Sequence, residues 1–210
     1  STPLYSSAAS DVYKRQLPLR MKVIVGLGNP GREYDATRHN VGWWLLDHLA
    51  QRWHFEPFRK DGDAVSTTGL VGGKKVKLVK PQTYMNKSGE VLRSYLKREG
   101  WSAAQDLLVL VDEVAVPVGE YRLRAAGSPG GHNGLKSVEA HVKSPTYPRL
   151  RIGIKPIDER RQIGDLADFV LHPMPRDERA LVEAQYERMC TAVELWIADG
   201  TEKAVSTMGR

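Results

Sequence analysis

Short apolar runs alternate along this chain with longer stretches in which apolar residues recur every three or four positions. Residues 22–27 and 107–111 are runs typical of buried strands. Residues 40–53 place their apolar side chains on one face of a helix. The other expected elements are a hairpin of 65–71 and 74–80 around Gly72-Gly73, helices at 88–99, 134–142 and 175–199, and strands at 118–124 and 149–154.

The order of these elements predicts the fold class. Strands and helices alternate, and the hairpin makes part of the sheet antiparallel. We therefore expect a single α/β domain with a twisted mixed β-sheet flanked by helices on both faces. The 210 residues, 41% of them hydrophobic, suffice for one sizeable core. Residues 125–131 are expected to form a flexible loop or lid, and 156–165 a charged loop.

The first twenty residues differ from the rest of the chain. They are rich in serine, show no periodicity and lack the apolar core of a secretory signal. An arginine-containing transit peptide is one interpretation, and a leader that is not native, with translation starting at Met21, is the other. We interpret 1–20 as a disordered, non-native leader and 21–210 as the folded domain.

Charge and cysteine content bear on the possible partners and on the cellular location. The net charge of +6 permits a polyanionic partner without requiring one. Cys190 is the single cysteine, so a disulfide within the chain is impossible, and a cytoplasmic location fits. No apolar run approaches the roughly 18 residues that a membrane span needs.

Asparagine recurs in three glycine-containing motifs, and a His-Asn pair joins them. The amide donates and accepts hydrogen bonds without carrying charge, which suits a neutral, polar reaction such as ester hydrolysis. The four motifs are GLGNPG at 26–31, RHN at 38–40, TYMNKSG at 83–89 and GGHNG at 130–134.

The first motif also has the GxGxxG spacing of a dinucleotide-binding turn. That interpretation needs a second strand that ends in an acidic residue about 20 residues on, where this chain has a helix-like stretch. Pro30 also removes one backbone N–H from the turn. The alternative is a tight turn that presents Asn29 in the crevice at the carboxyl edge of the sheet.

His39 is the candidate general base, since it lies between a loop and a helix start and can titrate near neutral pH. Asp112 follows a predicted strand at the same edge and could bind the second ring nitrogen. A structural histidine and a capping aspartate are the alternatives. The sequence has no G-x-S-x-G elbow, HExxH or CxxC motif. The simplest hydrolysis is therefore direct attack by water that His39 activates, without a metal or cofactor.

Asn86 and Asn133 stand at predicted helix starts. Capping of a helix and binding of a ligand are both open for them, and the neighbouring glycines allow close approach. His132 could be a second acid–base group, although a binding or loop-shaping role is favoured.

Four arginines lie in two predicted strands. Arg122 and Arg124 share one strand face, as do Arg149 and Arg151. Arginine suits bidentate recognition of phosphate. A solvated strand face explains the same spacing.

Together these motifs resemble the bacterial peptidyl-tRNA hydrolase family. The resemblance runs from Met21 to about Gly200 and rests on VGLGNPGREYDATRHNVG, KPQTYMNKSG, DEVAVPVGEYRLRAAGSPGGHNG and RLRIGI in this order. It implies a soluble, mostly monomeric and metal-free enzyme. Such an enzyme cleaves the ester between a peptide and the 3′ end of tRNA, which recycles tRNAs that leave the ribosome prematurely.

The resemblance also implies roles for individual residues. His39 would be the general base, Asp112 its orienting partner, and Asn29 the group that positions water or the carbonyl. Two arginines, Arg124 and Arg151, match a basic clamp on the tRNA 5′-phosphate. The residues expected to bind the rest of the substrate are Tyr34, near the terminal adenosine, Met85, Asn86, His132 of the gating loop, and Asn133.

One position departs from the family pattern. Relatives often read D-[DE]-L-D-L-P where this chain reads DEVAVP, so Ala115 replaces an acid while Asp112 is kept. The runner-up function is an RNA-binding relative without activity, like the plant organelle intron-splicing factors of this fold. The retained His39 and asparagines favour an enzyme, whereas a true transit peptide would favour the binding protein.

Overall fold

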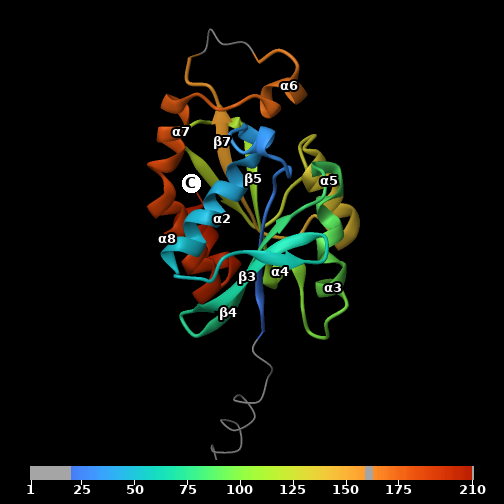
Figure 1. The fold of residues 1–210 in the computed structure, drawn as a ribbon. Coiled ribbons are helices and arrows are strands. Elements are labelled where there is room, and N and C mark those ends of the chain that lie inside the picture. The colour runs from blue at the N-terminus through green and yellow to red at the C-terminus, as the bar shows by residue number, and fades with distance from the viewer. Residues whose placement is uncertain (1–19, 159–162, 210) are drawn as a thin grey trace, which may run out of the picture.

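A seven-stranded mixed sheet lies at the centre of the protein (Figure 1). The computed structural model describes residues 20–158 and 163–209, and the strand count refers to these residues. The strand order is β2-β3-β4-β1-β5-β7-β6. The strands are β1 (Lys22–Gly26), β2 (Arg59–Asp61), β3 (Ala64–Val71), β4 (Lys74–Pro81), β5 (Leu107–Pro117), β6 (Tyr121–Arg124) and β7 (Arg149–Lys155).

The middle of the sheet is parallel and its margins are antiparallel. Strands β4, β1, β5 and β7 run in the same direction. The hairpin partners β2, β3 and β4 pair antiparallel, as do β6 and β7. The expected mixed sheet is confirmed. Because parallel strands end at one edge, the segments that follow β1, β4 and β5 meet there.

Helices cover both faces of the sheet, as expected (Figure 1). One face packs against α2 and α8, and the other against η3 and α5. The helical segments are η1 (Arg32–Tyr34), η2 (Arg38–Asn40), α2 (Val41–Arg52), η3 (Met85–Leu92), α3 (Arg93–Leu96), α4 (Ala103–Asp106), α5 (Asn133–Val142), α6 (Leu166–Leu171), α7 (Arg176–Glu183), α8 (Tyr186–Asp199) and α9 (Thr201–Met208).

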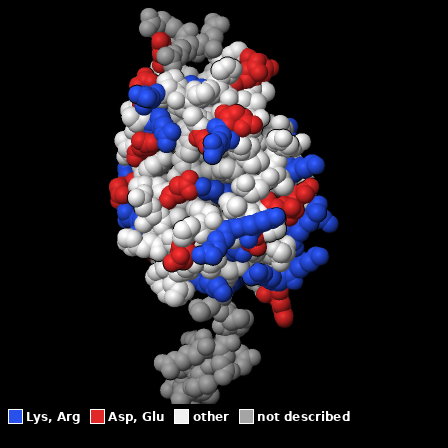
Figure 2. All heavy atoms as spheres, in the orientation of Figure 1, with Lys and Arg blue, Asp and Glu red and all other residues white. Residues whose placement is uncertain are grey.

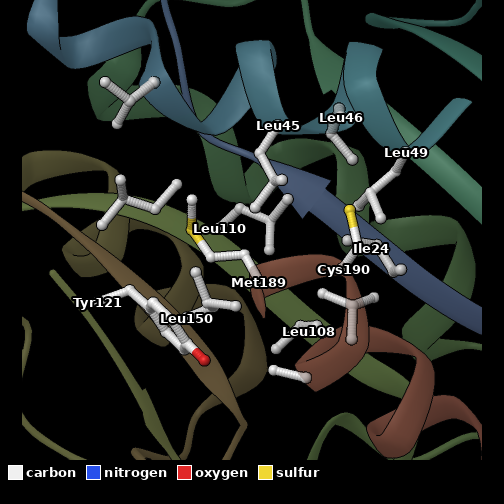
Figure 3. Close-up of a cluster of buried hydrophobic side chains, with 14 of the residues drawn as sticks. Ile24, Leu45, Leu46, Leu49, Leu108, Leu110, Tyr121, Leu150, Met189 and Cys190 are labelled. Carbon is white, nitrogen blue, oxygen red and sulfur yellow. The ribbon is translucent and has the colours of Figure 1, made fainter. Parts of the chain in front are cut away.

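Side-chain alternation along the central strands divides the core into two clusters. Ile24 and Leu108 face α2 and α8, where they meet Leu45 and Met189 (Figure 3). Their sequence neighbours point to the opposite face and pack under η3 and α5. Full burial of one such aliphatic side chain contributes about 1.5–3 kcal/mol. The apolar runs of the sequence are therefore strands that are buried on both sides.

The helix expected at 88–99 differs in kind from the observed segment. Residues 85–92 form the 3-10 helix η3, and α3 has only one turn. Gly89 N–H donates to Ser137 Oγ on α5 at 3.0 Å. A Cβ on Gly89 would lie 2.2 Å from the Ser137 carbonyl oxygen. The close contact with α5 thus takes a backbone group out of the α-helical pattern.

Two further boundaries were predicted wrongly. The helix expected at 175–199 is divided into α7 and α8, because Gln185 N–H bonds to the Val182 carbonyl, three residues back. The strand expected at 118–124 starts only at Tyr121. The preceding strand β5 continues to Pro117, and Gly119 turns the chain with a φ of 86°.

The remaining expectations concern the chain ends, the surface and the single cysteine. Residues 1–19 of the expected leader and 159–162 of the expected charged loop lie outside the described residues. On the face shown in Figure 2, Lys and Arg gather at the lower right, where Figure 1 places α3, while positive and negative side chains mix above.

Burial raises the pKa of the Cys190 thiol to about 12, which fits an inert core residue. Within 20–158 and 163–209, no helix has the length and hydrophobicity to cross a membrane.

Candidate active site

The glycines of the GLGNPG motif allow helix α2 to lie close against the strands. A Cβ on Gly26 would be 2.6 Å from the Gly42 carbonyl oxygen, and one on Gly42 would be 2.6 Å from the Leu110 carbonyl oxygen. After α2 the chain enters the β2–β3 hairpin rather than a second parallel strand. The topology therefore does not provide the acidic strand end that a dinucleotide site needs.

The Asn29 side chain is held in one orientation. Its Oδ1 accepts a hydrogen bond from Met85 N–H at 2.8 Å. Asn40 binds the Asn29 backbone at both ends, since its Oδ1 accepts from the Asn29 N–H at 2.9 Å and its Nδ2 donates to the Asn29 carbonyl at 3.0 Å. Because Oδ1 is engaged, the Nδ2 of Asn29 is the part left for the cavity that this residue lines.

Asn40 is a residue of the candidate site whose contact with Asn29 sequence reasoning missed. It belongs to the RHN motif, but only its neighbour His39 was given a role. The signal was its position in the motif, one residue after the candidate base.

His39 and Asp112 form the expected pair. Nδ1 of His39 lies 2.9 Å from Oδ1 of Asp112, and both residues are buried. Burial lowers the pKa of His39, but the charge and hydrogen bond of Asp112 outweigh burial, so this pKa lies above its ordinary value of 6.5. Burial raises the pKa of Asp112, yet its histidine partners hold it well below its ordinary range. With Nδ1 donating to the carboxylate, Nε2 is the nitrogen of His39 that can serve as a base.

His132 also contacts Asp112, which the sequence did not predict. Its Nε2 lies 2.9 Å from the same Oδ1, while its Nδ1 accepts from the N–H groups of Gly134 at 3.1 Å and Leu135 at 3.3 Å. A ring nitrogen that accepts carries no proton, so Nε2–H is the donor to Asp112. His132, rather than Asn133, thus caps α5.

These groups open into one cavity of about 510 Å³. Tyr84 precedes η3, so Asn86 is not its cap, and Asn86 is exposed to the cavity. Leu166 and other residues of α6 also line the cavity. The cavity brings together nine of the ten expected site residues: Asn29, Tyr34, His39, Met85, Asn86, Asp112, His132, Asn133 and Arg151.

Sequence comparison identifies the family. A profile of the peptidyl-tRNA hydrolases matches residues 23–210. The chain belongs to the peptidyl-tRNA hydrolase family. Peptidyl-tRNA hydrolase of Gemmatimonas aurantiaca is 85% identical over 190 residues, which cover 90% of this chain and 100% of that protein. The protein of the same name from Lachnospira eligens is 40% identical over 189 residues, or 89% of this chain and 98% of that one.

Solved structures agree with this membership. The crystal structure of peptidyl-tRNA hydrolase from Acinetobacter baumannii matches with a TM-score of 0.79 at 32% identity, and the match covers 92% of this chain and 97% of that chain. The expected α/β fold is confirmed by this likeness as well as by the sheet itself.

Arg124, which was expected to form a phosphate clamp with Arg151, lies outside the cavity. Arg124 donates to the carbonyls of Leu123 and Gly209. Arg151 forms an ion pair with Glu113 and donates to the Ser128 carbonyl at 2.8 Å. The β6–β7 register nevertheless puts both arginines on one face of the sheet. Their joint contact with one phosphate stays a prediction.

Arg149 has the same spacing as Arg151 but a different environment. It is fully buried, stacks on Tyr147 at 3.9 Å, and donates to the carbonyls of Gly127 at 2.7 Å and Pro145 at 2.8 Å. The interpretation of a solvated strand face is therefore wrong for Arg149. This residue instead anchors the 125–131 loop, which forms part of the cavity rim.

Helix α6 provides an apolar side of the cavity that sequence reasoning missed. We call it the α6 wall. Helix α6 was missed because it is short and directly follows the expected charged loop at 156–165. Tyr84, which is 66% exposed, was also missed although it lies within the TYMN motif. The residues of the α6 wall are Leu166, Ala167, Val170 and Leu171.

The cluster of His39, Asp112 and His132 is also, among the described residues, a group that could hold a metal ion. The ligand atoms of His39, Asp112 and His132 lie within 4.8 Å of one another. Both histidine–carboxylate distances are 2.9 Å, a hydrogen-bond length. The described contacts are those of a hydrogen-bonded network centred on Asp112.

Ala115, the departure from the family pattern, lies away from these groups. It is exposed near the end of β5, and its N–H donates to Glu113 Oε1 at 3.0 Å. The expected catalytic pair is therefore untouched by the substitution.

Proposed function

We propose that the protein hydrolyses the ester that joins a peptide to tRNA, and so recycles tRNAs released prematurely from the ribosome. Membership of the peptidyl-tRNA hydrolase family supports this substrate. The observation that carries the mechanism is the hydrogen-bonded His39–Asp112 pair beside the amide of Asn29, all three at one cavity.

In this mechanism, His39 Nε2 takes a proton from a water molecule as that water attacks the ester carbonyl carbon. Asp112 keeps the imidazole oriented and stabilises the imidazolium. The Nδ2 group of Asn29 donates a hydrogen bond to the oxygen on which negative charge develops. The imidazolium then returns the proton to the departing 3′-oxygen, which leaves a free acid and a free tRNA end.

The proposal needs no covalent intermediate. The described residues that line the cavity include no serine, threonine or cysteine. Water is then the simplest nucleophile, and no cofactor enters the scheme. We also propose that the enzyme works without a metal ion, as a monomer in the cytoplasm.

The remaining cavity residues would bind the two parts of the substrate. Asn86 and Asn133 would bind the peptidyl part and help to hold the ester, and Tyr34 and Met85 would line the cleft, with Tyr34 near the terminal adenosine. The arginine pair, Arg124 and Arg151, would bind the 5′-phosphate of the tRNA. His132 would hold Asp112 and the start of α5 in register.

One assay tests the proposal. Purified protein is mixed in excess with an N-blocked aminoacyl-tRNA in the presence of EDTA, and peptide release is measured together with tRNA binding on filters. We expect release that the His39→Ala variant loses. Binding of tRNA without release would instead support the RNA-binding relative that lacks activity. Release that EDTA abolishes would contradict the metal-free mechanism.

A further inference from the structure

Arg38, the residue before His39, is buried against α6 and α7. Its Nη2 donates to Glu178 Oε2 at 2.8 Å, and both side chains are buried. Its Nη1 lies 3.4 Å from the carbonyl oxygens of Phe169 and Pro173. Its guanidinium carbon lies 4.3 Å from the centre of the Phe169 ring. One side chain thus contacts α6, the turn that follows it, and α7.

Backbone pairing links the same segments. Thr37 pairs with Pro173 in an isolated antiparallel bridge, and Met174 N–H donates to the Ala36 carbonyl at 2.8 Å. Residues 172–175 form a strap between α6 and α7. This strap is therefore bound to residues 36 and 37, just before Arg38 and His39. A shift of this strap would move α6 relative to the catalytic base.

The α6 wall depends on such a tether for its position. A helix of six residues is not stable without tertiary contacts. Leu166 is 44% exposed and Leu171 is 40% exposed, so both ends of the helix are only partly covered by protein. Its side chains face a cavity whose other lining includes His39.

We propose that Arg38 and Glu178 are positioning residues that fix the α6 wall relative to His39, and that the wall binds the apolar side chain of the residue esterified to tRNA. The inference rests on the proposed function, because it assigns part of the same cavity to the peptidyl group. Neither residue touches the reacting atoms.

Directional contacts distinguish this pair from ordinary core packing. Apolar residues of similar volume often replace a buried ion pair without loss of stability. They cannot hydrogen-bond the carbonyls of Phe169 and Pro173, the two contacts by which Arg38 would orient α6. Arg38 Nε is buried without a hydrogen-bond partner among the described residues, an unfavourable feature for a contact that only stabilises. The arrangement fits a role in orientation.

The experiment compares an apolar replacement of the pair with a matched control. The test variant is Arg38→Met/Glu178→Leu, and a second variant, Glu178→Gln, keeps the shape of the side chain. The control is Glu183→Gln, which removes an exposed ion pair with Arg179 on the same helix. Thermal unfolding, kcat and KM are measured with N-acetyl-leucyl-tRNA and N-acetyl-glycyl-tRNA, and amide exchange is followed over 166–171.

We expect the double variant to fold with a melting temperature near that of the wild type. KM for the leucyl ester should rise about tenfold, the low end of what one methylene in an apolar pocket contributes, while the glycyl ester changes less. The acid limb of the pH profile should stay in place because His39 keeps Asp112, and exchange over 166–171 should become faster. Glu178→Gln should show the same changes at smaller size, and the control should show none.

Two outcomes overturn the inference. A folded double variant with wild-type KM and exchange would make the pair purely structural, and equal losses on both esters would remove the apolar subsite. If the double variant does not fold, Glu178→Gln gives the same decision. Failure of the wild type to hydrolyse either ester would refute the proposed function instead, and the exchange comparison would still test the tether.

Discussion

Two regions of the sheet hold their functional groups in different ways. We call them the catalytic edge, which carries the proposed catalytic residues Asn29 and His39, and the arginine edge, which carries Arg124 and Arg151 on β6 and β7. Asn29 and His39 are buried, and each has a partner fixed by the fold. Arg151 is bound to a carboxylate and to a loop carbonyl, both of which a phosphate could replace. The first arrangement suits groups that must be preorganised for a chemical step. The second suits groups that exchange partners when a charged ligand arrives.

The largest effect is expected from His39→Ala. Loss of a general base costs about 10²–10⁴-fold in turnover, while tRNA binding, which belongs to the other edge, should survive. Single-turnover deacylation and filter binding measure the two separately. His54→Asn, in an exposed turn with a φ of 53°, is the control histidine variant. If the alanine variant keeps more than about a third of the rate, His39 is not the base that the mechanism requires.

Asn29→Asp should follow in size. A carboxylate still accepts from Met85 N–H but loses the donor that faces the cavity, and it repels developing negative charge. Loss of one such donor costs about 10²–10³-fold in kcat. The measurement is kcat in a variant whose circular dichroism matches the wild type. Unchanged kinetics would reduce Asn29 to a turn residue.

Asp112→Asn should shift the pH profile. His39 acts as a base only when neutral, and Asp112 raises its pKa, so the acid limb of kcat/KM should lie above pH 6.5 in the wild type. Without the charge, burial dominates and the limb should move to lower pH, while the maximal rate falls by at least about tenfold because the imidazole is no longer oriented. A limb that stays in place would show that another group titrates.

The same pair has a consequence for stability. A histidine with a raised pKa in the folded state stabilises the fold most below its unfolded pKa, and this contribution disappears as pH rises through the folded value. Urea unfolding between about pH 5 and 8 should show this decline in the wild type and not in Asp112→Asn. An identical decline in both proteins would assign it to other groups.

A smaller effect is expected at the arginine edge. Arg124→Ala and Arg151→Ala should each raise KM with little change in kcat, because each removes binding energy that the ground state and the transition state share. The two effects should not add if both arginines bind one phosphate, and they should shrink on tRNA without a 5′-phosphate. The slope of log affinity against log salt concentration should flatten by about 0.7–0.9 for each phosphate interaction that a substitution removes. Equal effects on both tRNAs would refute the clamp.

The contrast between the two edges also explains what could be predicted from the sequence. The proposed catalytic residues stand in motifs near the ends of buried strands, where an apolar run and the parallel topology together place them. The tether between Arg38 and Glu178 spans 140 residues, and no local pattern relates such distant positions. Spacing also cannot distinguish Arg149 from Arg151, because both donate to carbonyls of the 125–131 loop and only Arg149 is fully buried beneath it.

The smallest predicted effect concerns Glu113, which occupies the guanidinium of Arg151 in the free protein. A phosphate must compete with this carboxylate, so Glu113→Gln should lower KM for tRNA with a 5′-phosphate. Desolvation of this largely buried pair offsets much of its attraction, so we expect a net effect near that of exposed pairs, about 0.2–1 kcal/mol, or at most roughly fivefold. Glu90→Gln, which removes the pair with the exposed Arg93, is the control. The measurement is KM at two salt concentrations with phosphorylated and dephosphorylated tRNA. A KM that rises would mean that Glu113 holds Arg151 ready for the phosphate, and the arginine edge would then be preorganised like the catalytic one.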